Sequence, residues 1–388
     1  MVEGPVVVSR KGEARVLRGH PWIFRTDVVR AQGITPGAVV RVEGIRGRPL
    51  GFAFYSARSE IRLRMIDRGE TLPEAFLRDR VEAAVRWRES VAEGAAACRL
   101  VHGEGDRLPS LIVDRYGDYL VVQTLSQGTE ARKEEVVRIL VERLRPAGIL
   151  ERNDPRVRAL EGLDQRVGLL HGEVPERVVV NEGDVRFEAD LWRGQKTGLF
   201  LDQRENHLMA RSYARGRVLD GFSYHGGFAL HAARVAGEVL AVDTSAEAVA
   251  QIVRNAERNG LGNFAAREAN VFDLLRELYD RGERFDTVIL DPPAFAKSKD
   301  AVEKAVRGYK EINLRALKLL EPGGCLITCS CSYHVHEADF EEILAAAAAD
   351  AQATVTVVEK RRQARDHPVV LGVPETYYLK CFVLRKLA

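Results

Sequence analysis

The pattern of hydrophobic and polar positions changes at about residue 190. Beyond it, apolar runs are interleaved with segments of helical period, and the runs lie in RVLDGFS, EVLAVDTS, FDTVILDPP and CLITCSCS. Unbroken apolar runs are typical of parallel strands that are buried on both faces of a sheet. TVTVVEK and TYYLKCFVLR close the chain without a long helix between them, which predicts an antiparallel pair. Residues 189–388 are therefore predicted to form a doubly wound α/β sheet with a reversed edge strand, the last strand being antiparallel.

The first 188 residues follow two other patterns. Residues 1–70 contain short strand-like stretches between Pro and Gly turns, GAVVRVEG, PLGFAFYS and IRLRMI, which predict a small β-barrel. Apolar and basic residues alternate in 61–65, which predicts a half-buried strand with a basic outer face. Residues 71–188 combine amphipathic helices at 74–93 and 129–144 with several strands. They predict an α+β middle domain, in which Thr129 is a candidate N-cap.

Composition and charge narrow the class of protein. A chain of 388 residues, 46% hydrophobic and 29% charged, is globular and long enough for two or three domains. No segment approaches a membrane span, the N-terminus lacks an apolar signal region and cysteines are few, so we expect a cytoplasmic protein. The net charge of +2 conceals a net +6 in residues 1–70, which carry 13 Lys and Arg against 7 Asp and Glu. That excess suggests a polyanion-binding module, although codon usage explains the arginine content of the whole chain at least as well.

Polar residues follow the predicted parallel strands at their carboxyl ends. The first strand leads into LDGFSYHGGF, where Asp220 precedes Gly226 and Gly227. This stretch lacks G-x-G-x-x-G and fits a dinucleotide pyrophosphate poorly, but paired glycines allow close approach to another ligand. Asp243 ends the second strand, where a carboxylate can accept both hydroxyls of a ribose, and Asp273 is expected at the next strand end, beside an adenine amino group. Each acid alone is equally well explained as a helix cap or a surface residue.

The stretch DPPAF, residues 291–295, follows the apolar run FDTVIL. Two consecutive prolines remove backbone donors and stiffen the loop. A rigid loop beside a cofactor can present its carbonyl groups and Phe295 to a flat, flipped base. The stretch therefore predicts a substrate-side loop.

Cys325, Cys329 and Cys331 lie in one predicted strand. Alternation places them on one face, with a spacing unlike that of zinc-binding pairs in turns, so no metal site is expected. A bridge between Cys329 and Cys331 would be strained, and the cytoplasm disfavours it. Cys325 is expected in the core. Cys331 differs because it falls at the carboxyl end of the strand among polar residues, where a substrate would lie.

These motifs resemble those of the class I S-adenosylmethionine-dependent methyltransferases. More closely, GQKTGLFLDQREN, HGEGDRLPSLIVDRYGD and SCSYH resemble the RlmI-like large-subunit ribosomal RNA cytosine-C5 methyltransferases, over nearly the whole chain. The resemblance implies a PUA RNA-binding domain (1–70), an α+β middle domain (71–188) and a Rossmann-like methyltransferase domain (189–388). It implies S-adenosyl-L-methionine as the cofactor and large-subunit ribosomal RNA as the partner. The cofactor-binding residues that we carry over to this sequence are Thr197, Asp220, Phe222, Ser223, Tyr224, Gly226, Gly227, Asp243, Ser245, Asn270, Phe272, Asp273, Asp291 and Pro292.

The same resemblance assigns the nucleophile to Cys331. C5 of cytosine is too weakly nucleophilic to take a methyl group unaided, whereas addition of a thiolate to C6 makes C5 carbanion-like. Cys329 is the second candidate, and Asp291 or water is the candidate base for the C5 proton. Many cytosine-C5 RNA methyltransferases have a second cysteine after the proline motif, but here Ala294 follows Pro293. The group that helps the thiolate to leave is therefore not identified.

Three other functions agree with parts of the sequence. Methylation of an exocyclic amine of a nucleobase or a protein would use D-P-P-x-aromatic and no thiol. An RNA-binding or assembly factor with a vestigial pocket disagrees with the intact Asp220, Gly226, Gly227 and Asp243. A nicotinamide oxidoreductase fits the fold class but not the glycine spacing. The target nucleotide does not follow from the sequence. A homodimer is a possible assembly, and it would lengthen the basic surface.

Overall fold

A computed structural model describes residues 2–296 and 298–387. The chain folds into two compact units. The first unit holds the chain up to Val180 with residues 189–199 and 365–376, and the second holds 181–188, 200–364 and the chain from Tyr377. The three domain boundaries expected from the sequence are a different division and stay a prediction. In the described part of the chain, no helix has the length and apolar character needed to cross a membrane.

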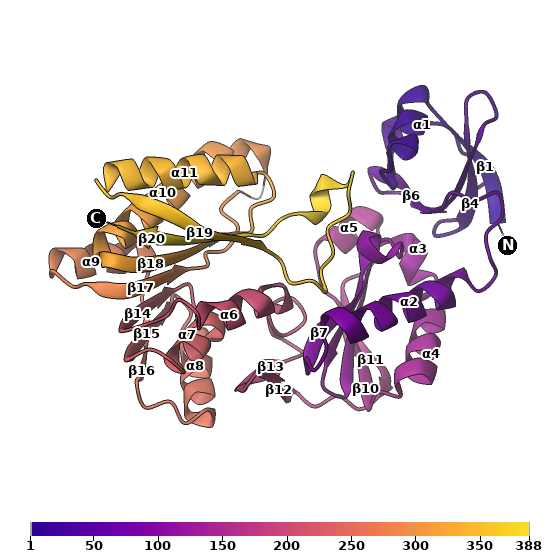
Figure 1. The fold of residues 1–388 in the computed structure, drawn as a ribbon. Helices are drawn as coiled ribbons and strands as arrows, with labels where there is room; N and C mark the ends of the chain where they lie inside the picture. Colours follow the sequence, from indigo (N-terminus) through magenta and orange to yellow (C-terminus); the bar gives the residue numbers. More distant parts are fainter. Residues whose placement is uncertain (1, 297, 388) are drawn as a thin grey trace. The chain divides into compact units, whose positions relative to one another are not determined.

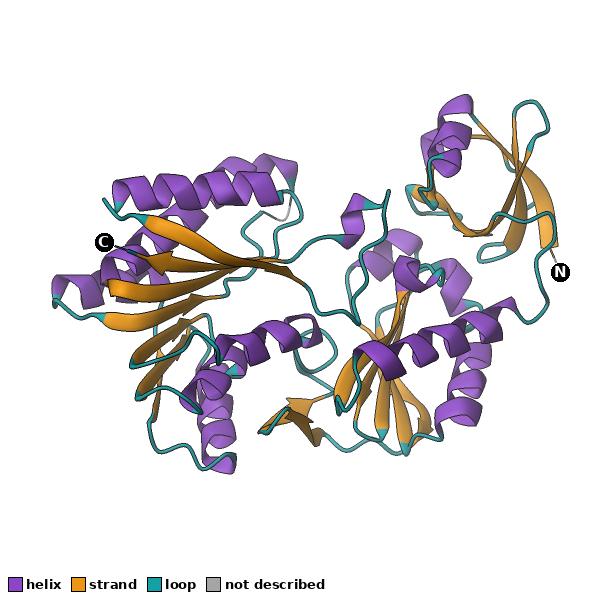
Figure 2. Ribbon diagram, viewed as in Figure 1, coloured by secondary structure: helices purple, strands orange, loops and turns teal. Residues whose placement is uncertain are grey.

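The N-terminal part of the first unit is a curled six-stranded sheet with the order β2-β6-β5-β4-β1-β3 (Figures 1 and 2). Its valines, leucines and isoleucines alternate along the strands and form one core with the single helix. The elements are β1 (Val2–Val8), α1 (Arg10–Leu17), β2 (Trp22–Phe24), η1 (Arg25–Asp27), β3 (Val28–Arg30), β4 (Val39–Gly44), β5 (Pro49–Tyr55) and β6 (Ile61–Asp67).

A five-stranded sheet with the order β11-β10-β9-β8-β7 forms the rest of the first unit. Only β9 and β10 run parallel; the other neighbours are antiparallel. Its elements are α2 (Phe76–Val91), β7 (Ala97–His102), η2 (Gly103–Asp106), β8 (Leu111–Tyr116), β9 (Tyr119–Thr124), α3 (Gln127–Glu130), α4 (Lys133–Leu144), β10 (Gly148–Asn153), α5 (Val157–Glu161), β11 (Arg166–Gly172) and η5 (Pro374–Thr376). Thr129 does not cap the helix predicted at 129–144: that segment is two helices, and Thr129 completes the capping box of Ser126 at the start of α3.

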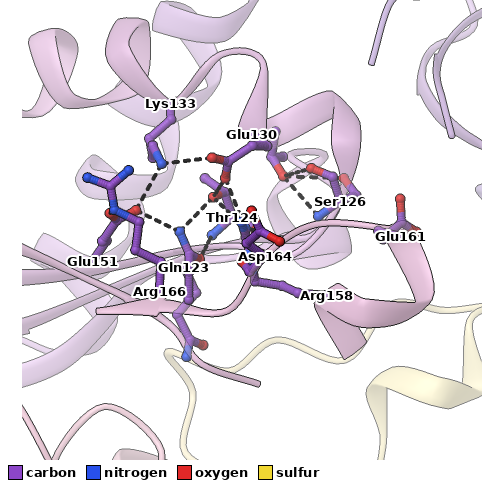
Figure 3. A network of polar contacts seen from close by, with 12 residues as sticks. Gln123, Thr124, Ser126, Glu130, Lys133, Glu151, Arg158, Glu161, Asp164 and Arg166 are labelled. Atoms are coloured by element: carbon purple, nitrogen blue, oxygen red, sulfur yellow. Dashed lines mark hydrogen bonds and ion pairs between the residues drawn. The ribbon is translucent and has the colours of Figure 1, made fainter. Parts of the chain in front are cut away.

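The first unit contains a partly buried network of charged side chains, in which Glu151 is fully buried. Lys133 lies between Glu130 and Glu151, with Nζ–O distances of 2.8 and 2.9 Å (Figure 3). Arg64 of β6 is also buried, and its guanidinium lies 2.8 Å from Glu161. The alternating pattern predicted that Arg64 lies on a basic outer face of the strand. This prediction is wrong for Arg64, because its side chain is buried. Because an unpaired buried charge is costly, the Arg64–Glu161 pair fixes β6 against α5.

A seven-stranded sheet with the order β16-β15-β14-β17-β18-β20-β19 forms the centre of the second unit. Its strands are β14 (Arg217–Gly221), β15 (Glu238–Asp243), β16 (Phe264–Glu268), β17 (Phe285–Leu290), β18 (Leu320–Ser330), β19 (Val355–Arg362) and β20 (Lys380–Lys386). The first five in this chain order run parallel, and β20 is antiparallel to both of its neighbours. The last strand is thus reversed as predicted, but it lies one place inside the edge, which β19 forms. The doubly wound α/β class is confirmed.

Helices cover both faces of this sheet (Figure 2). Apolar residues of α9, α10 and α11 pack on one face, and those of α6, α7 and α8 pack on the other. The elements are α6 (Arg204–Ala210), α7 (Gly227–Ala233), α8 (Ala246–Arg258), α9 (Val271–Asp280), α10 (Val302–Leu319) and α11 (Glu337–Asp350), with η3 (Leu201–Gln203) and η4 (Lys299–Ala301). The hairpin of β12 (Arg177–Glu182) and β13 (Val185–Asp190) carries residues 181–188 into this unit.

Candidate cofactor and catalytic site

The chain order of the sheet reverses at β14. The next two strands of the chain, β15 and β16, lie on one side of β14, and β17 lies on its other side. Ligands of such sheets bind beyond the carboxyl ends of the strands at this switch point. Asp220, Asp243 and Asp291 lie at or just after the carboxyl ends of β14, β15 and β17, so three of the predicted acids share this edge.

Asp220 is an almost fully buried carboxylate with an unsatisfied oxygen. Its Oδ2 accepts from the Ser223 hydroxyl at 2.6 Å and from the Ala229 N–H at 3.1 Å. Its Oδ1 is buried and has no hydrogen-bond partner among the described residues. Burial, reinforced by the nearby Asp291 carboxylate, raises the pKa of Asp220 to about 7. A cationic group beside Oδ1 would satisfy both the orphaned oxygen and the charge repulsion.

The loop between β14 and α7 has an unusual backbone conformation. Phe222, Tyr224 and Gly226 all have positive φ angles, of 65°, 49° and 85°. A Cβ added at Gly227 would lie 2.4 Å from the ring of His207, so only glycine fits there. The loop therefore turns sharply, whereas the close approach of a ligand to the paired glycines stays a prediction.

Asp243 accepts two backbone N–H groups, from Tyr224 to Oδ2 at 2.9 Å and from Ser245 to Oδ1 at 3.0 Å. These bonds fix the carboxylate against the glycine loop and leave further lone pairs on both oxygens. Ser245 is also the N-cap of α8, because its hydroxyl accepts from the Ala248 N–H at 3.2 Å. The residues fit a ribose at this edge, since a half-buried carboxylate with spare lone pairs can accept two hydroxyls.

The next strand end differs from the expectation. β16 ends at Glu268, and Asn270 caps α9 by accepting from the Phe272 N–H at 2.9 Å. Asp273 does not lie at the strand end: it is exposed within the first turn of α9. The rings of Phe222, Phe272 and Phe295 pack together with centroid distances of 5.8 to 6.4 Å. An apolar aromatic cluster is therefore present beside these polar groups.

The DPPAF loop and the CSCSYH segment lie in contact. Cys331 follows the last residue of β18, and its Sγ lies 3.8 Å from the Pro292 carbonyl oxygen, to which it donates. The Ser332 hydroxyl accepts from the Ala296 N–H at 3.1 Å and lies 2.9 Å from the Tyr309 hydroxyl. The structure thus brings together two motifs that are almost forty residues apart in the sequence.

The three cysteines of this segment differ in accessibility. Cys325 and Cys329 are buried among apolar residues of one core. Burial raises the pKa of the Cys325 thiol to about 12, and burial beside Cys381 raises that of Cys329 well above its ordinary value. Cys331 is partly exposed and, because it lies beyond the end of β18, does not share the strand alternation of the other two. Of the three thiols, Cys331 is the one that a substrate could reach.

Thr197 lies in the other unit. Its hydroxyl donates to Asp114 Oδ2 at 2.7 Å and lies 2.9 Å from the Tyr116 hydroxyl. It is 1% exposed, and it holds residues 189–199 against β8. A role for Thr197 in cofactor binding stays a prediction.

The sequence reasoning missed a charged cluster behind the glycine loop. Glu182 Oε1 lies 2.9 Å from His207 Nδ1 and 3.0 Å from His231 Nε2. Although burial opposes charge on both groups, their mutual attraction lowers the pKa of Glu182 to about 2 and raises that of His207. Arg211 donates to His231 Nδ1, so His231 donates through Nε2. An acid and two histidines from separate elements carry no local signal, so only the fold reveals them.

Lys380 is a second residue that was missed. It is 2% exposed, and its Nζ donates to the carbonyl oxygens of Ser332 at 2.7 Å and Tyr378 at 3.0 Å. Burial lowers the pKa of Lys380 to about 8. A signal was available, because one lysine interrupts the largely apolar stretch TYYLKCFVL, which was predicted to form a strand of the terminal antiparallel pair.

Comparison with known proteins gives matches along the whole chain. Residues 98–383 match a family model described as S-adenosylmethionine-dependent methyltransferase, and residues 6–68 match a PUA-like domain. The chain is 41% identical over 396 residues to the Ribosomal RNA large subunit methyltransferase I of Vibrio cholerae, covering 99% of this chain and 100% of that protein. It is 42% identical to the protein of the same name from Aliivibrio fischeri, covering 97% and 98%.

Solved structures share the fold. A putative S-adenosylmethionine-dependent methyltransferase from Streptococcus mutans superposes with a TM-score of 0.83 at 22% identity, and the match covers 99% of this chain and 100% of that one. A structure described as a putative methyltransferase complexed with SAH has a TM-score of 0.85 at 21% identity and the same coverage. The likeness therefore extends over the complete architecture.

Proposed function

The chain belongs to the S-adenosylmethionine-dependent methyltransferase family, and we propose from this that it methylates C5 of a cytosine in large-subunit ribosomal RNA through a covalent adduct with Cys331. The choice of RNA is supported by relatives that are named for the large ribosomal subunit and by the PUA-like match at residues 6–68. The net +6 of residues 1–70 agrees with a polyanionic partner. A second copy of the chain would lengthen that basic surface.

The residues at the carboxyl edge fit the cofactor. Asp220, with its orphaned buried oxygen, would hold the ammonium group, and Asp243 would hold the ribose hydroxyls. Phe222, Phe272 and the Asn270 cap would flank the adenine, and the sharp loop at Gly226 would admit the methionine part. When it is bound, S-adenosylmethionine supplies a methyl group to a nucleophile.

The observation that carries the proposal is the accessible thiol of Cys331 beside the Pro292 carbonyl. The Cys331 thiolate bonds to C6 of the cytosine, and the electron pair of the C5–C6 double bond moves towards C5. C5 would then take the methyl group of the bound cofactor, as the bond between that methyl group and the cofactor sulfur breaks and leaves its electron pair on the sulfur. The C5 hydrogen leaves as a proton to Asp291 or to water, its electron pair restores the double bond, and the C6–S bond breaks to release the thiolate.

Mass-spectrometric mapping of ribosomal RNA tests this proposal. Cells that lack the protein should lose one 5-methylcytidine from large-subunit RNA, and the parent protein should restore it. Cys331→Ser should not restore it, whereas Cys329→Ala should, because Cys329 is a buried core residue. Methylation of an exocyclic amine by the DPPAF loop is the competing function, and a nitrogen-methylated base that persists in Cys331→Ser would favour it.

A further inference from the structure

Lys380 lies on the strand next to the proposed nucleophile Cys331. It is the first residue of β20 and lies opposite Ser330 in the antiparallel pairing with β18. Its Nζ donates to the carbonyl oxygen of Ser332, the residue that follows Cys331, at 2.7 Å. The backbone of Lys380 therefore pairs with the residue before Cys331, and its ammonium group binds the carbonyl of the residue after Cys331.

No carboxylate in the described part of the chain forms an ion pair with this buried ammonium group. Lysine has three N–H donors, and the carbonyls of Ser332 and Tyr378 accept two of them. The acids that act on it, Glu337 and Asp339, have other partners: Glu337 accepts from Tyr377 and lies 3.6 Å from Lys360 Nζ, and Asp339 accepts from the His336 N–H. A buried cation without a counter-ion is costly.

Cys331 is the neighbour that can supply the missing negative charge. Cys331 directly precedes the residue whose carbonyl binds the ammonium group, and the charge of its thiolate favours the Lys380 cation, as do those of Asp339 and Glu337. Burial lowers the pKa of Lys380 to about 8, so the amine is close to its titration point near neutral pH. An amine in that range can both accept a proton from a thiol and, once charged, stabilise the thiolate.

We propose that Lys380 is the counter-ion that forms and holds the thiolate of Cys331. The neutral amine accepts the thiol proton, so that S–H and N become a thiolate and an ammonium group with no net change in charge. After methyl transfer, the same ammonium group stabilises the thiolate as the C6–S bond breaks. The role in catalysis rests on the proposed function, and it supplies the leaving-group assistance that a second cysteine provides in other enzymes. Lys380 acts through Cys331 and is a positioning residue.

The pH dependence of Cys331 alkylation tests the pairing without RNA or cofactor. Cys98, Cys325, Cys329 and Cys381 are buried, so iodoacetamide reports Cys331 in the folded protein, with Cys331→Ser as the blank. Other titratable or charged groups also act on this region, and the alkylation profile must be interpreted with them in mind: Asp291, Tyr309, Glu337, Asp339 and Arg362. These groups are present in every variant compared.

Lys380→Met should move the alkylation midpoint to higher pH by at least about one unit, which lowers the rate near pH 7 about tenfold. Lys380→Arg, which keeps the charge, should recover part of the shift. Lys386→Met is the matched control, because Lys386 lies at the other end of β20 and donates to two backbone carbonyls in the same way. It should leave the midpoint unchanged.

An unchanged midpoint in folded Lys380→Met would overturn the pairing. If that variant fails to fold, the pH midpoint of Cys331 alkylation in the parent protein tests the proposal instead. An ordinary thiol has a pKa of about 8.5, so a midpoint at or above that value contradicts the proposal, and a lower midpoint supports it. The alkylation experiment tests the ion pair independently of the proposed methylation reaction. A midpoint shift without any covalent RNA adduct would keep the ion pair and reject the methylation chemistry.

Discussion

Replacing Asp220 by Asn separates what this carboxylate costs the fold from what it does for the cofactor. Asp220 is 1% exposed, and burial raises its pKa from 3.8 to about 7. At about 1.4 kcal/mol per pKa unit, the ionised side chain disfavours folding by about 4 kcal/mol above pH 7. Below pH 7 the folded protein keeps a proton that the unfolded chain has lost, so the penalty shrinks as the pH falls and is absent below about pH 4.

Asparagine has nearly the same shape and carries no charge. Asp220→Asn should therefore raise the free energy of unfolding of the cofactor-free protein by about 2–4 kcal/mol at pH 8, and by less than half as much at pH 5. Its affinity for S-adenosylmethionine should fall, because a neutral amide cannot pair with the ammonium group. Denaturant unfolding at the two pH values measures the first effect, and calorimetric titration measures the second.

Asp243→Asn is the matched control. The Asp243 carboxylate accepts N–H groups from Tyr224 and Ser245. An amide loses part of this acceptor capacity, so the variant should lose about 1 kcal/mol of stability at both pH values and should also bind cofactor less well, with RNA affinity nearly unchanged. If Asp220→Asn were no more stable than the parent at pH 8, or bound cofactor equally well, the assignment of Asp220 would be wrong.

Three further outcomes are expected. Glu161→Gln should destabilise the protein by about 3–5 kcal/mol because it leaves Arg64 buried and unpaired, whereas Glu142→Gln, at an exposed ion pair, should cost under about 1 kcal/mol in the same unfolding assay. Glu182→Gln should lose more stability at pH 6 than at pH 8.5, because the raised pKa of His207 gives stability that is present at low pH and is lost as the pH rises through that pKa. Neutralising the exposed basic residues Lys11, Arg41 and Arg46 should flatten the salt dependence of RNA binding by about 0.7–0.9 per lost phosphate contact. An unchanged slope would exclude these residues, which lie in α1, in β4 and in the turn after β4, from the interface.

Local patterns were sufficient for the features that depend on one segment. The unbroken apolar runs identified four of the five parallel strands, β14, β15, β17 and β18, because strands that are buried on both faces have no polar face, whereas β16 is partly exposed and has no such run. The acids at the strand ends, Asp220 and Asp243, could be found because parallel strands place their carboxyl ends at one edge. The DPPAF loop and Cys331 followed from the same rule, applied to β17 and β18.

Features that depend on pairing between distant segments could not be predicted. The position of β20 between β18 and β19, and with it the contact of Lys380 with Ser332, follows from strand order rather than from strand sequence. Arg64 faces a buried glutamate that lies almost one hundred residues further along, so alternation alone suggested an exposed cation. Asp273 was misplaced because the helix cap at Asn270 ends the loop earlier than the apolar pattern indicated.

RNA that carries 5-fluorocytidine at the target position tests the central claim most directly. Fluorine at C5 cannot leave as a proton does, so the adduct between Cys331 and C6 should form, accept the methyl group and stall. We predict a covalent complex that is stable in a denaturing gel, requires S-adenosylmethionine, is absent in Cys331→Ala and persists in Cys329→Ala and Cys325→Ala. A complex that persists in Cys331→Ala but vanishes in Cys329→Ala would contradict the assignment of the nucleophile. Absence of any complex, together with methyl transfer to a base nitrogen, would contradict the thiolate mechanism itself.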